Sequence, residues 1–162
     1  KDLTESGVVI MDCNGENEKR FPKVDGSNFA WSSDGKQLAF ISKDGGSNHI
    51  FVMTIDNGNL KKVVSISESI EDLVWSYDGK KFAYIKWNSK RNGLWVLDMK
   101  SGMTKEIVSD IGKIIGWAKD NKTLFYEYGH IYSISVEDGE PKQITKVSVI
   151  TKNYCNPVQF LK

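Results

Sequence analysis

The sequence has few residues of the kinds that hold metals or crosslink small folds. Its 162 residues include two cysteines, Cys13 and Cys155, and two histidines, His49 and His130. Two cysteines are too few for a disulfide-dependent fold, and two histidines alone do not complete a zinc site. No Asp-x-Asp-x-Asp-Gly calcium loop is present either. We therefore expect neither a metal nor a cofactor.

The chain also lacks an excess of either charge and any long apolar run. Lys and Arg total 22 against 21 Asp and Glu, whereas a nucleic-acid-binding protein needs a basic face that neutralises phosphates. No apolar run approaches the ~20 residues that cross a bilayer. We expect no nucleic-acid partner and no membrane insertion. Because the chain opens on Lys1 rather than Met, we also expect a mature protein or an excised piece.

The common motifs of catalysis are missing as well. The sequence has no Gly-x-Ser-x-Gly, no His-Glu-x-x-His and no Gly-x-x-x-x-Gly-Lys. Glu71 and Asp72 form an acidic pair, and a solvated strand end explains it better than acid–base chemistry. We predict that the chain is not an enzyme. The prediction stays open for the case in which the chain is a fragment of a larger peptidase.

An internal repeat is the strongest feature of the sequence. Residues 31–36, Trp-Ser-Ser-Asp-Gly-Lys, recur at 75–80 as Trp-Ser-Tyr-Asp-Gly-Lys and more weakly at 117–122 as Trp-Ala-Lys-Asp-Asn-Lys. The intervals are 44 and 42 residues, and residues 31–65 and 75–109 share 13 identities in 35 positions. Asp-Gly and Asp-Asn are residue pairs that make tight hairpin turns. A repeat of this length predicts a modular architecture.

Each repeat predicts four short strands and no helix. In the first repeat the first strand ends at Trp31, and the other three cover 37–42, 49–55 and 60–65. We name the four strands A to D in chain order. Segments such as Leu38-Ala39-Phe40 are apolar on both faces of the strand, so the sheets must be covered on both sides. Four-stranded units of ~40–45 residues stacked on one another are the blades of a β-propeller.

The blade count predicts an open ring. We expect strands C and D of a partial blade in 1–24, full blades in 25–66, 67–109 and 110–146, and one further strand A in 147–162 that ends near Phe160. Propellers have 4–8 blades, so this set of strands does not close a ring. The segment is therefore expected to be part of a larger propeller, or of an assembly that another chain or a second copy completes.

The motif Trp-Ser-x-Asp-Gly-Lys, followed by Leu38-Ala39-Phe40 or Phe82-Ala83-Tyr84, resembles the TolB-type propeller repeat. The resemblance implies a non-catalytic scaffold outside the cytoplasm, periplasmic, secreted or at the cell surface, that engages another protein or peptide segment. The alternative is the gating propeller of a prolyl-oligopeptidase-like serine peptidase. A third possibility is an enzyme that works in the propeller channel.

A protein-binding face is expected where the D–A and B–C loops emerge, around the start of each strand A. Trp87 lies there among polar neighbours, and an exposed Trp beside Arg suits a protein contact; a Trp folded over its own blade and ordinary charged loop ends remain the alternatives. Trp31, Trp75 and Trp117 share one repeat position and are expected to be buried between blades. The predicted contact residues are Asn28, Glu71, Asp72, Trp87, Lys90, Arg91 and Lys113.

Overall fold

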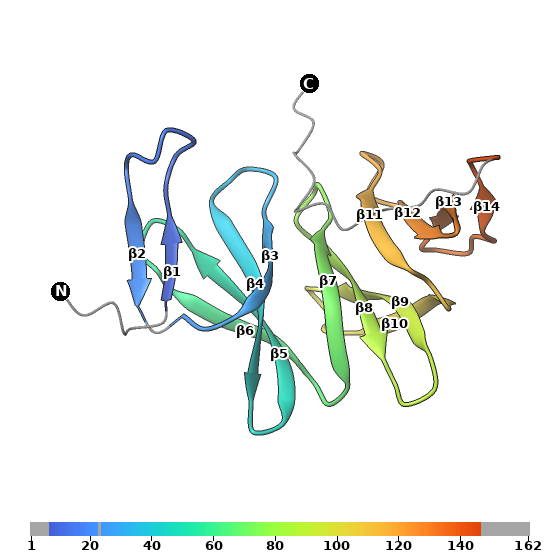
Figure 1. Ribbon diagram of the computed structural model, residues 1–162, viewed down its shortest axis with the longest axis horizontal. Helices are drawn as coiled ribbons and strands as arrows, with labels where there is room; N and C mark the ends of the chain where they lie inside the picture. The colour runs from blue at the N-terminus through green and yellow to red at the C-terminus, as the bar shows by residue number, and fades with distance from the viewer. Residues whose placement is uncertain (1–6, 23, 147–162) are drawn as a thin grey trace.

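The computed structural model describes residues 7–22 and 24–146 (Figure 1). All regular secondary structure in this part of the chain is β-strand. The strands form one two-stranded and three four-stranded sheets, which are antiparallel throughout. The predicted all-β architecture of four-stranded blades in an open ring is therefore confirmed. No helix capable of spanning a membrane occurs among the described residues.

The sheets follow one another along the chain. The partial blade is β1 (Gly7–Ile10) and β2 (Lys19–Pro22). Blade one is β3 (Ser27–Trp31), β4 (Gln37–Asp44), β5 (Ser47–Thr54) and β6 (Leu60–Ile66). Blade two is β7 (Ser69–Trp75), β8 (Lys81–Trp87), β9 (Asn92–Asp98) and β10 (Thr104–Ser109). Blade three is β11 (Lys113–Trp117), β12 (Thr123–Tyr128), β13 (His130–Ser135) and β14 (Lys142–Gln143).

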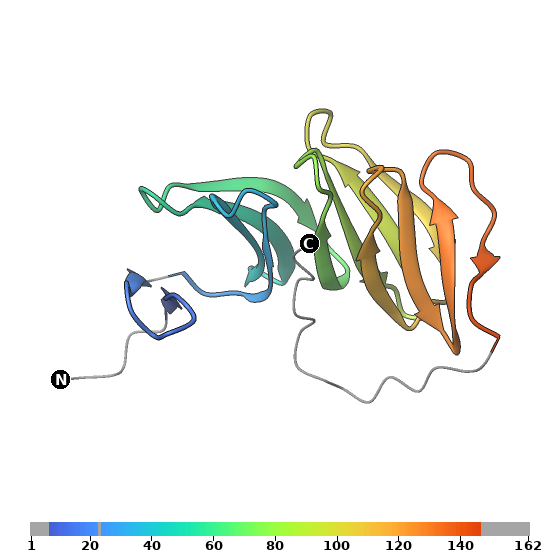
Figure 2. The same cartoon turned by 90° about the horizontal axis from the view of Figure 1, so that it is seen from above.

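The blades stand side by side with their first strands adjacent. Within each full blade the strands pair in sequence order, and β7 lies between β3 and β11. Figure 2 shows the sheets fanned along the chain, with the partial blade set apart from blade one. The A strands, which in a propeller surround the channel, therefore line one side of the arc.

The repeated Trp-Ser-x-Asp-Gly-Lys motif builds the turn between strands A and B. The buried Ser32 hydroxyl donates to Asp34 Oδ1 at 2.7 Å and accepts from the Gln37 amide at 2.9 Å. Gly35 takes a φ of 69°, in the left-handed region that a side chain disfavours. Blade two repeats these contacts through Ser76 and Asp78. The motif is thus a turn cap, and its polar residues are used within the blade.

Blade three makes the same turn with different residues. Ala118 replaces the serine, and Thr123 donates its hydroxyl to Asp120 Oδ2 at 2.7 Å while its amide donates to Asp120 Oδ1 at 2.8 Å. Asn121 takes the place of glycine and adopts a φ of 58°, which Asn tolerates better than most residues. The weakest sequence copy therefore keeps the cap through a hydroxyl on strand B.

The hydrophobic core lies between neighbouring blades. Trp75 of blade two is 7% exposed and packs in a cluster with Ala39 and Ile50 of blade one. Trp117 of blade three is 6% exposed, packs with Ala83 of blade two, and donates its Nε1–H to the Val74 carbonyl at 3.3 Å. Each tryptophan thus anchors its blade to the preceding one, as the repeat predicted for these two positions.

The prediction of burial is wrong for Trp31, which is 39% exposed. Trp31 faces the partial blade, where only strands C and D precede it. Strands A and B, which supply part of the cover for Trp75 and Trp117, have no counterpart among the described residues there. Trp31 is exposed because the described part of the preceding blade covers it less completely. The exposure therefore does not contradict the alignment of the repeats.

The observed strands differ slightly from the predicted ones. β4 extends to Asp44 and β5 begins at Ser47, because the chain turns tightly through Gly45 and Gly46 at positive φ. The first strand of a further blade, with Phe160 and Cys155, falls in 147–162, outside the described residues. Cys13 is exposed and carries a free thiol.

Replacing Trp117 with alanine is expected to lower the free energy of unfolding by about 3–5 kcal/mol, because the ring leaves a cavity between two blades. The matched change Trp31→Ala should cost clearly less, because this ring is already partly solvated. Urea denaturation of both variants measures the difference. Equal losses would contradict the account of how each tryptophan is covered.

Candidate functional site

Among the predicted contact residues, Trp87, Lys90, Arg91 and Lys113 lie where the D–A and B–C loops emerge, on a face of the arc that we call the loop face. Ser69, at the start of β7, pairs with Trp87, at the end of β8, so the start of strand A and the B–C loop emerge together. Lys113, at the start of β11, pairs with Glu127 near the end of β12 in the same way. The opposite face carries the A–B and C–D turns, and we call it the turn face.

Asn28 and Asp72 occupy equivalent bulges in β3 and β7. Their φ angles are 53° and 52°, and the pairing with strand B shifts at both bulges. Asn28 Oδ1 accepts from the Asp72 amide at 3.3 Å, and Asp72 Oδ2 accepts from the Ile114 amide at 3.2 Å. These side chains form a ladder that joins the A strands of three blades. Their role in the described structure is cohesion, which the sequence prediction of a contact surface missed.

Glu71 and Lys113 are exposed beside this ladder. Glu71 is the third residue of β7, near the start of this strand A, and directly precedes the bulged Asp72. Lys113 is the first residue of β11. The A strands of blades two and three therefore carry charges of opposite sign on the channel side of the arc.

Trp87 projects from the end of β8 and is 41% exposed. The B–C loop behind it is a tight turn, in which Asn88 Oδ1 accepts from the amides of Lys90 and Arg91 at 2.9 and 3.0 Å. Arg91 lies back toward β10, with a nitrogen 3.4 Å from Glu106 Oε1. Both partners of this ion pair are substantially exposed, so it contributes little to stability. Trp87 and Lys90 are the side chains that this loop presents outward.

A polar cluster that the sequence did not reveal lies between blades one and two on the loop face. Lys86 Nζ is 3.0 Å from Glu68 Oε1 and 3.6 Å from the centroid of the Trp95 ring. Two hydrogen bonds hold the pKa of Glu68 below its ordinary value of 4.5. The larger effect comes from the hydroxyl of Ser67 and the smaller from Lys86. The Asn48 amide donates to the Glu68 carbonyl at 2.8 Å. The cluster fixes the D–A connection against the neighbouring blade.

The equivalent connection after blade two is held by Asn92. Its Nδ2 donates to the Ile111 carbonyl at 2.6 Å, and its Oδ1 accepts from the Ile111 amide at 3.0 Å. Asn48 and Asn92 are one of the 13 identities that residues 31–65 and 75–109 share. Their shared position at the start of strand C was the signal of a shared structural role.

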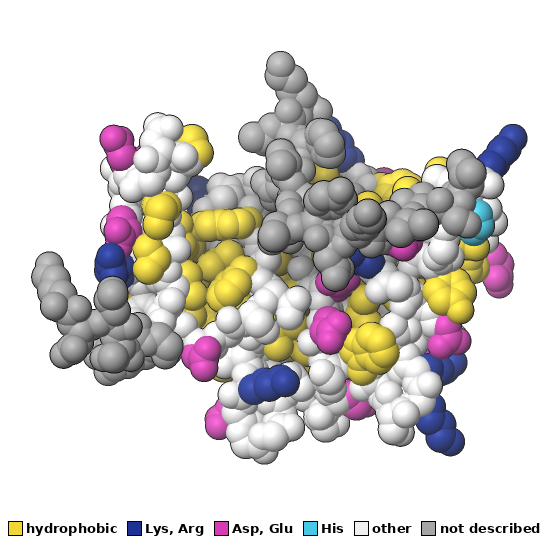
Figure 3. Space-filling model, in the orientation of Figure 1, with side chains coloured by type: hydrophobic (Ala, Val, Ile, Leu, Met, Phe, Trp, Pro, Cys, Tyr) yellow, Lys and Arg dark blue, Asp and Glu magenta, His cyan; other side chains and the backbone are white. Residues whose placement is uncertain are grey.

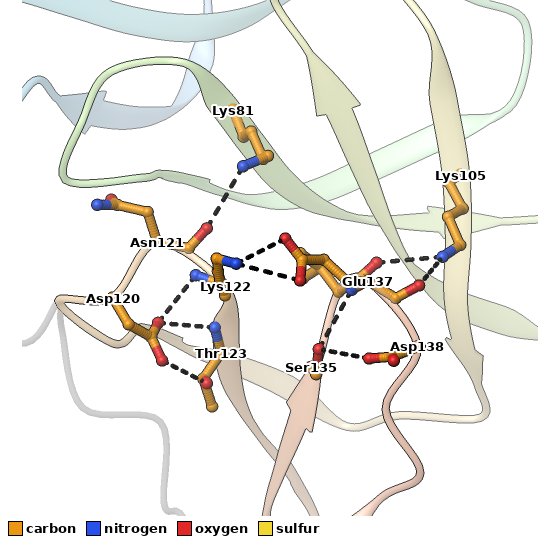
Figure 4. A network of polar contacts seen from close by, with 10 residues as sticks. Lys81, Lys105, Asp120, Asn121, Lys122, Thr123, Ser135, Glu137 and Asp138 are labelled. Carbon is orange, nitrogen blue, oxygen red and sulfur yellow. Dashed lines mark hydrogen bonds and ion pairs between the residues drawn. The ribbon is translucent and has the colours of Figure 1, made fainter.

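The turn face uses its polar groups to join blades two and three (Figure 4). Lys105 Nζ of blade two donates to the carbonyls of Val136 and Glu137 of blade three at 3.1 and 2.8 Å. Within blade three, Lys122 Nζ lies 3.1 Å from Glu137 Oε1. Lys81 Nζ donates to the Asn121 carbonyl at 3.4 Å. These contacts leave the loop face as the better candidate for binding.

Burial and local hydrogen bonds shift the pKa values of several side chains. Burial raises the pKa of Tyr84 to about 12 and also raises the pKa of Tyr126. The Ser32 hydroxyl lowers the pKa of Asp34. Within 7–22 and 24–146 no three His, Cys, Asp or Glu residues gather where they could hold a metal ion.

Neither a protein-family model nor a curated protein matches the chain in sequence. Solved structures do match it in three dimensions. TolB from Acinetobacter baumannii superposes with a TM-score of 0.74 at 19% identity, over 86% of this chain and 37% of that protein. The acylaminoacyl peptidase of Pyrococcus horikoshii superposes at 0.63 and 18% identity, over 90% of this chain and 28% of the peptidase.

A third match is the β-propeller domain of the Trilobed protease from Pyrococcus furiosus, which the comparison describes as having an open velcro topology. It superposes with a TM-score of 0.56 at 20% identity, over 73% of this chain and 41% of that chain. The fold of this chain is thus that of a β-propeller segment. Its blades are similar to those of TolB, as the sequence motif indicated, and at these identities the likeness concerns the fold. The chain spans less than half the length of each of the three proteins.

The bulge ladder yields a stability test. Asp72→Ala is expected to lower the free energy of unfolding by about 1–3 kcal/mol, because the Ile114 amide loses its partner and alanine disfavours the positive φ. Asp72→Asn should retain most of the stability, since Asn keeps an acceptor and tolerates this φ. Glu71→Ala is the matched control and should stay within about 0.5 kcal/mol of the parent. Denaturant unfolding checks all three, and an Asp72→Ala variant as stable as Glu71→Ala would remove the ladder's role.

The Glu68 cluster yields a pH test. A carboxylate whose pKa is lowered on folding stabilises the protein above its unfolded pKa, and this contribution is lost as the pH falls through the folded value. Glu68→Gln should therefore reduce stability at neutral pH and have progressively less effect below pH 4.5. In a Lys86→Met background the effect should shrink but persist, because Ser67 remains. Urea unfolding at a series of pH values measures it; a pH-independent difference would contradict the assignment.

Proposed function

We propose that this chain is part of a non-catalytic propeller scaffold that binds another protein or peptide segment through its loop face, outside the cytoplasm. The observation that carries the proposal is Trp87, an exposed indole at the end of a paired strand on a tightly turned loop. Tryptophan is the residue type most enriched at the centres of protein interfaces.

The rigidity of the loop favours binding. Trp87 pairs with both Ser69 and Asn92, and Asn88 closes the turn beyond it through two backbone amides. A partner that docks on a pre-ordered side chain loses less conformational entropy than one that must order a mobile loop. The site therefore needs little reorganisation to accept a ligand.

The charge of the face indicates the kind of ligand. Glu71 and Lys113 lie beside the A strands, and Lys90 lies farther out on the B–C loop. Charges of both signs spread over such a surface suit a polypeptide segment with complementary charges. Small-molecule pockets are instead mostly apolar and concave.

The second candidate function is the gating propeller of a prolyl-oligopeptidase-like serine peptidase. The structural likeness to the propeller domain of the Trilobed protease favours it. In this case a hydrolase domain elsewhere in the polypeptide would carry the nucleophile, and the propeller would restrict access to it. Labelling of the native protein by a fluorophosphonate probe supports the peptidase, and its absence in an active, folded preparation favours the scaffold.

The binding proposal is tested by partner capture from an envelope extract. Trp87→Ala and Glu71→Lys should each deplete the same captured proteins by a large factor, because they remove the aromatic contact or reverse a neighbouring charge. Tyr77→Ala is the matched control, since Tyr77 is an aromatic residue 50% exposed on the turn face. Variants that fold normally and retain every partner would exclude the loop face.

A further inference from the structure

We propose that the polar pocket between the A–B turns of blades one and two binds the primary carboxamide of a small neutral molecule. The carboxamide takes the place that the side chain of Asn121 occupies between blades two and three. The pocket lies on the turn face, away from Trp87. It is also separate from the apolar surface between the partial blade and blade one, where Figure 3 shows hydrophobic side chains gathered. The proposal is therefore independent of the one made for the loop face.

The pocket is small and is lined mostly by polar residues. Its volume is about 250 Å³, below the ~300–1,000 Å³ that is typical of pockets for drug-sized ligands. Both turns contribute a carboxylate to its lining, Asp34 from blade one and Asp78 from blade two. Ser33 ties the two turns together, because its hydroxyl donates to the Tyr77 carbonyl at 2.6 Å. A ligand of few atoms that makes hydrogen bonds suits this space.

The first observation is a buried donor without an acceptor. Trp75 lines the pocket and is 7% exposed, and its Nε1 has no hydrogen-bond partner among the described residues. The equivalent nitrogen of Trp117 donates to the Val74 carbonyl at 3.3 Å. Trp75 Nε1 lies 3.9 Å from the point where a Cβ on Gly79 would stand. Because a buried unpaired donor costs free energy, an acceptor placed beside Gly79 stabilises this junction.

The second observation is the group that stands at the same place in the next junction. Asn121 occupies the Gly79 position of the repeat, and its Oδ1 accepts from the Asp78 amide of blade two at 2.9 Å. Its Nδ2 donates to the Lys119 carbonyl at 3.3 Å. One carboxamide thus joins the A–B turns of blades two and three. Between blades one and two Gly79 has no side chain, so the equivalent amide, that of Asp34, receives no such acceptor from blade two.

The hydrogen-bonding groups of the pocket select the ligand. The Trp75 indole and the Asp34 amide are donors, so they require an acceptor oxygen and disfavour an ammonium group. The carboxylates of Asp34 and Asp78 accept hydrogen bonds and repel an anion. A neutral group with both an oxygen acceptor and N–H donors meets these requirements. The carboxamide is the group of this kind that the chain itself uses at the next junction.

The test titrates the 162-residue chain with propionamide and follows its nitrogen–proton correlation spectrum by NMR. We expect saturable shifts of the Asp34 amide and of the Trp75 indole, whose resonance is assigned by its absence in Trp75→Phe. The Trp117 indole already has an acceptor and should not shift. Propionate and propan-1-ol, which lack the neutral carboxamide, should shift none of these resonances.

Each other outcome of the titration contradicts the proposal. The absence of a saturable shift with propionamide means that the pocket holds only water. Equal shifts with propan-1-ol assign the pocket to hydroxyl ligands, and equal shifts of the Trp75 and Trp117 indoles indicate unspecific binding.

A matched pair of variants locates the site. Gly79→Asn supplies the carboxamide from the chain itself, since Asn tolerates the φ of 69° at this glycine. In this variant the Asp34 and Trp75 resonances should lie near their positions in the propionamide-bound parent, and propionamide should cause no further shift. Gly35→Asn makes the same change in the A–B turn of blade one, also at a φ of 69°, and should leave binding unchanged. Binding that persists in Gly79→Asn, or that is lost in Gly35→Asn, would overturn the proposal. The titration of the parent chain decides it independently of how well either variant folds.

Discussion

The structure depends on one constraint: its sheets are apolar on both faces and are stable only when both faces are covered. Ala39, Phe82 and Leu94 are fully inaccessible although they lie in four-stranded sheets, because each blade is packed against a neighbour. Each blade is therefore stabilised by packing against the blades next to it, as in other repeat proteins in which each unit contacts only its neighbours. The shared tryptophan position, the bulge ladder and the turn contacts all act at these junctions.

The same constraint separates the polar residues by role. Hydrogen-bonding side chains that recur with the repeat, such as Ser32, Asn92 and Asp72, are committed to turns or to the junction with the next blade. Trp87 does not recur, since blade one has Lys43 at this position, and its side chain reaches solvent. Variation on a fixed scaffold is where a repeat protein acquires binding specificity.

The fold was readable from the sequence because turn residues and two-sided apolar strands are local signals that three copies reinforce. The candidate site was readable only as a face, since Glu71, Trp87 and Lys113 emerge together once the strand order is known. The role of Asp72 was not, because a bulge and its positive φ arise from pairing with a neighbouring strand. The contact of Lys86 with Glu68 and Trp95 joins residues from different strands, and the exposure of Trp31 depends on what stands before it; no local pattern encodes either.

The A–B turn of blade three has a consequence for how such repeats diverge. In blades one and two a serine before the aspartate supplies the capping hydroxyl, and in blade three a threonine after it does so. A lineage can therefore gain the threonine first and lose the serine later, so that a hydroxyl contacts the aspartate at every step. Blades related by this route share a bonding pattern while losing the residue identity by which kinship is usually recognised.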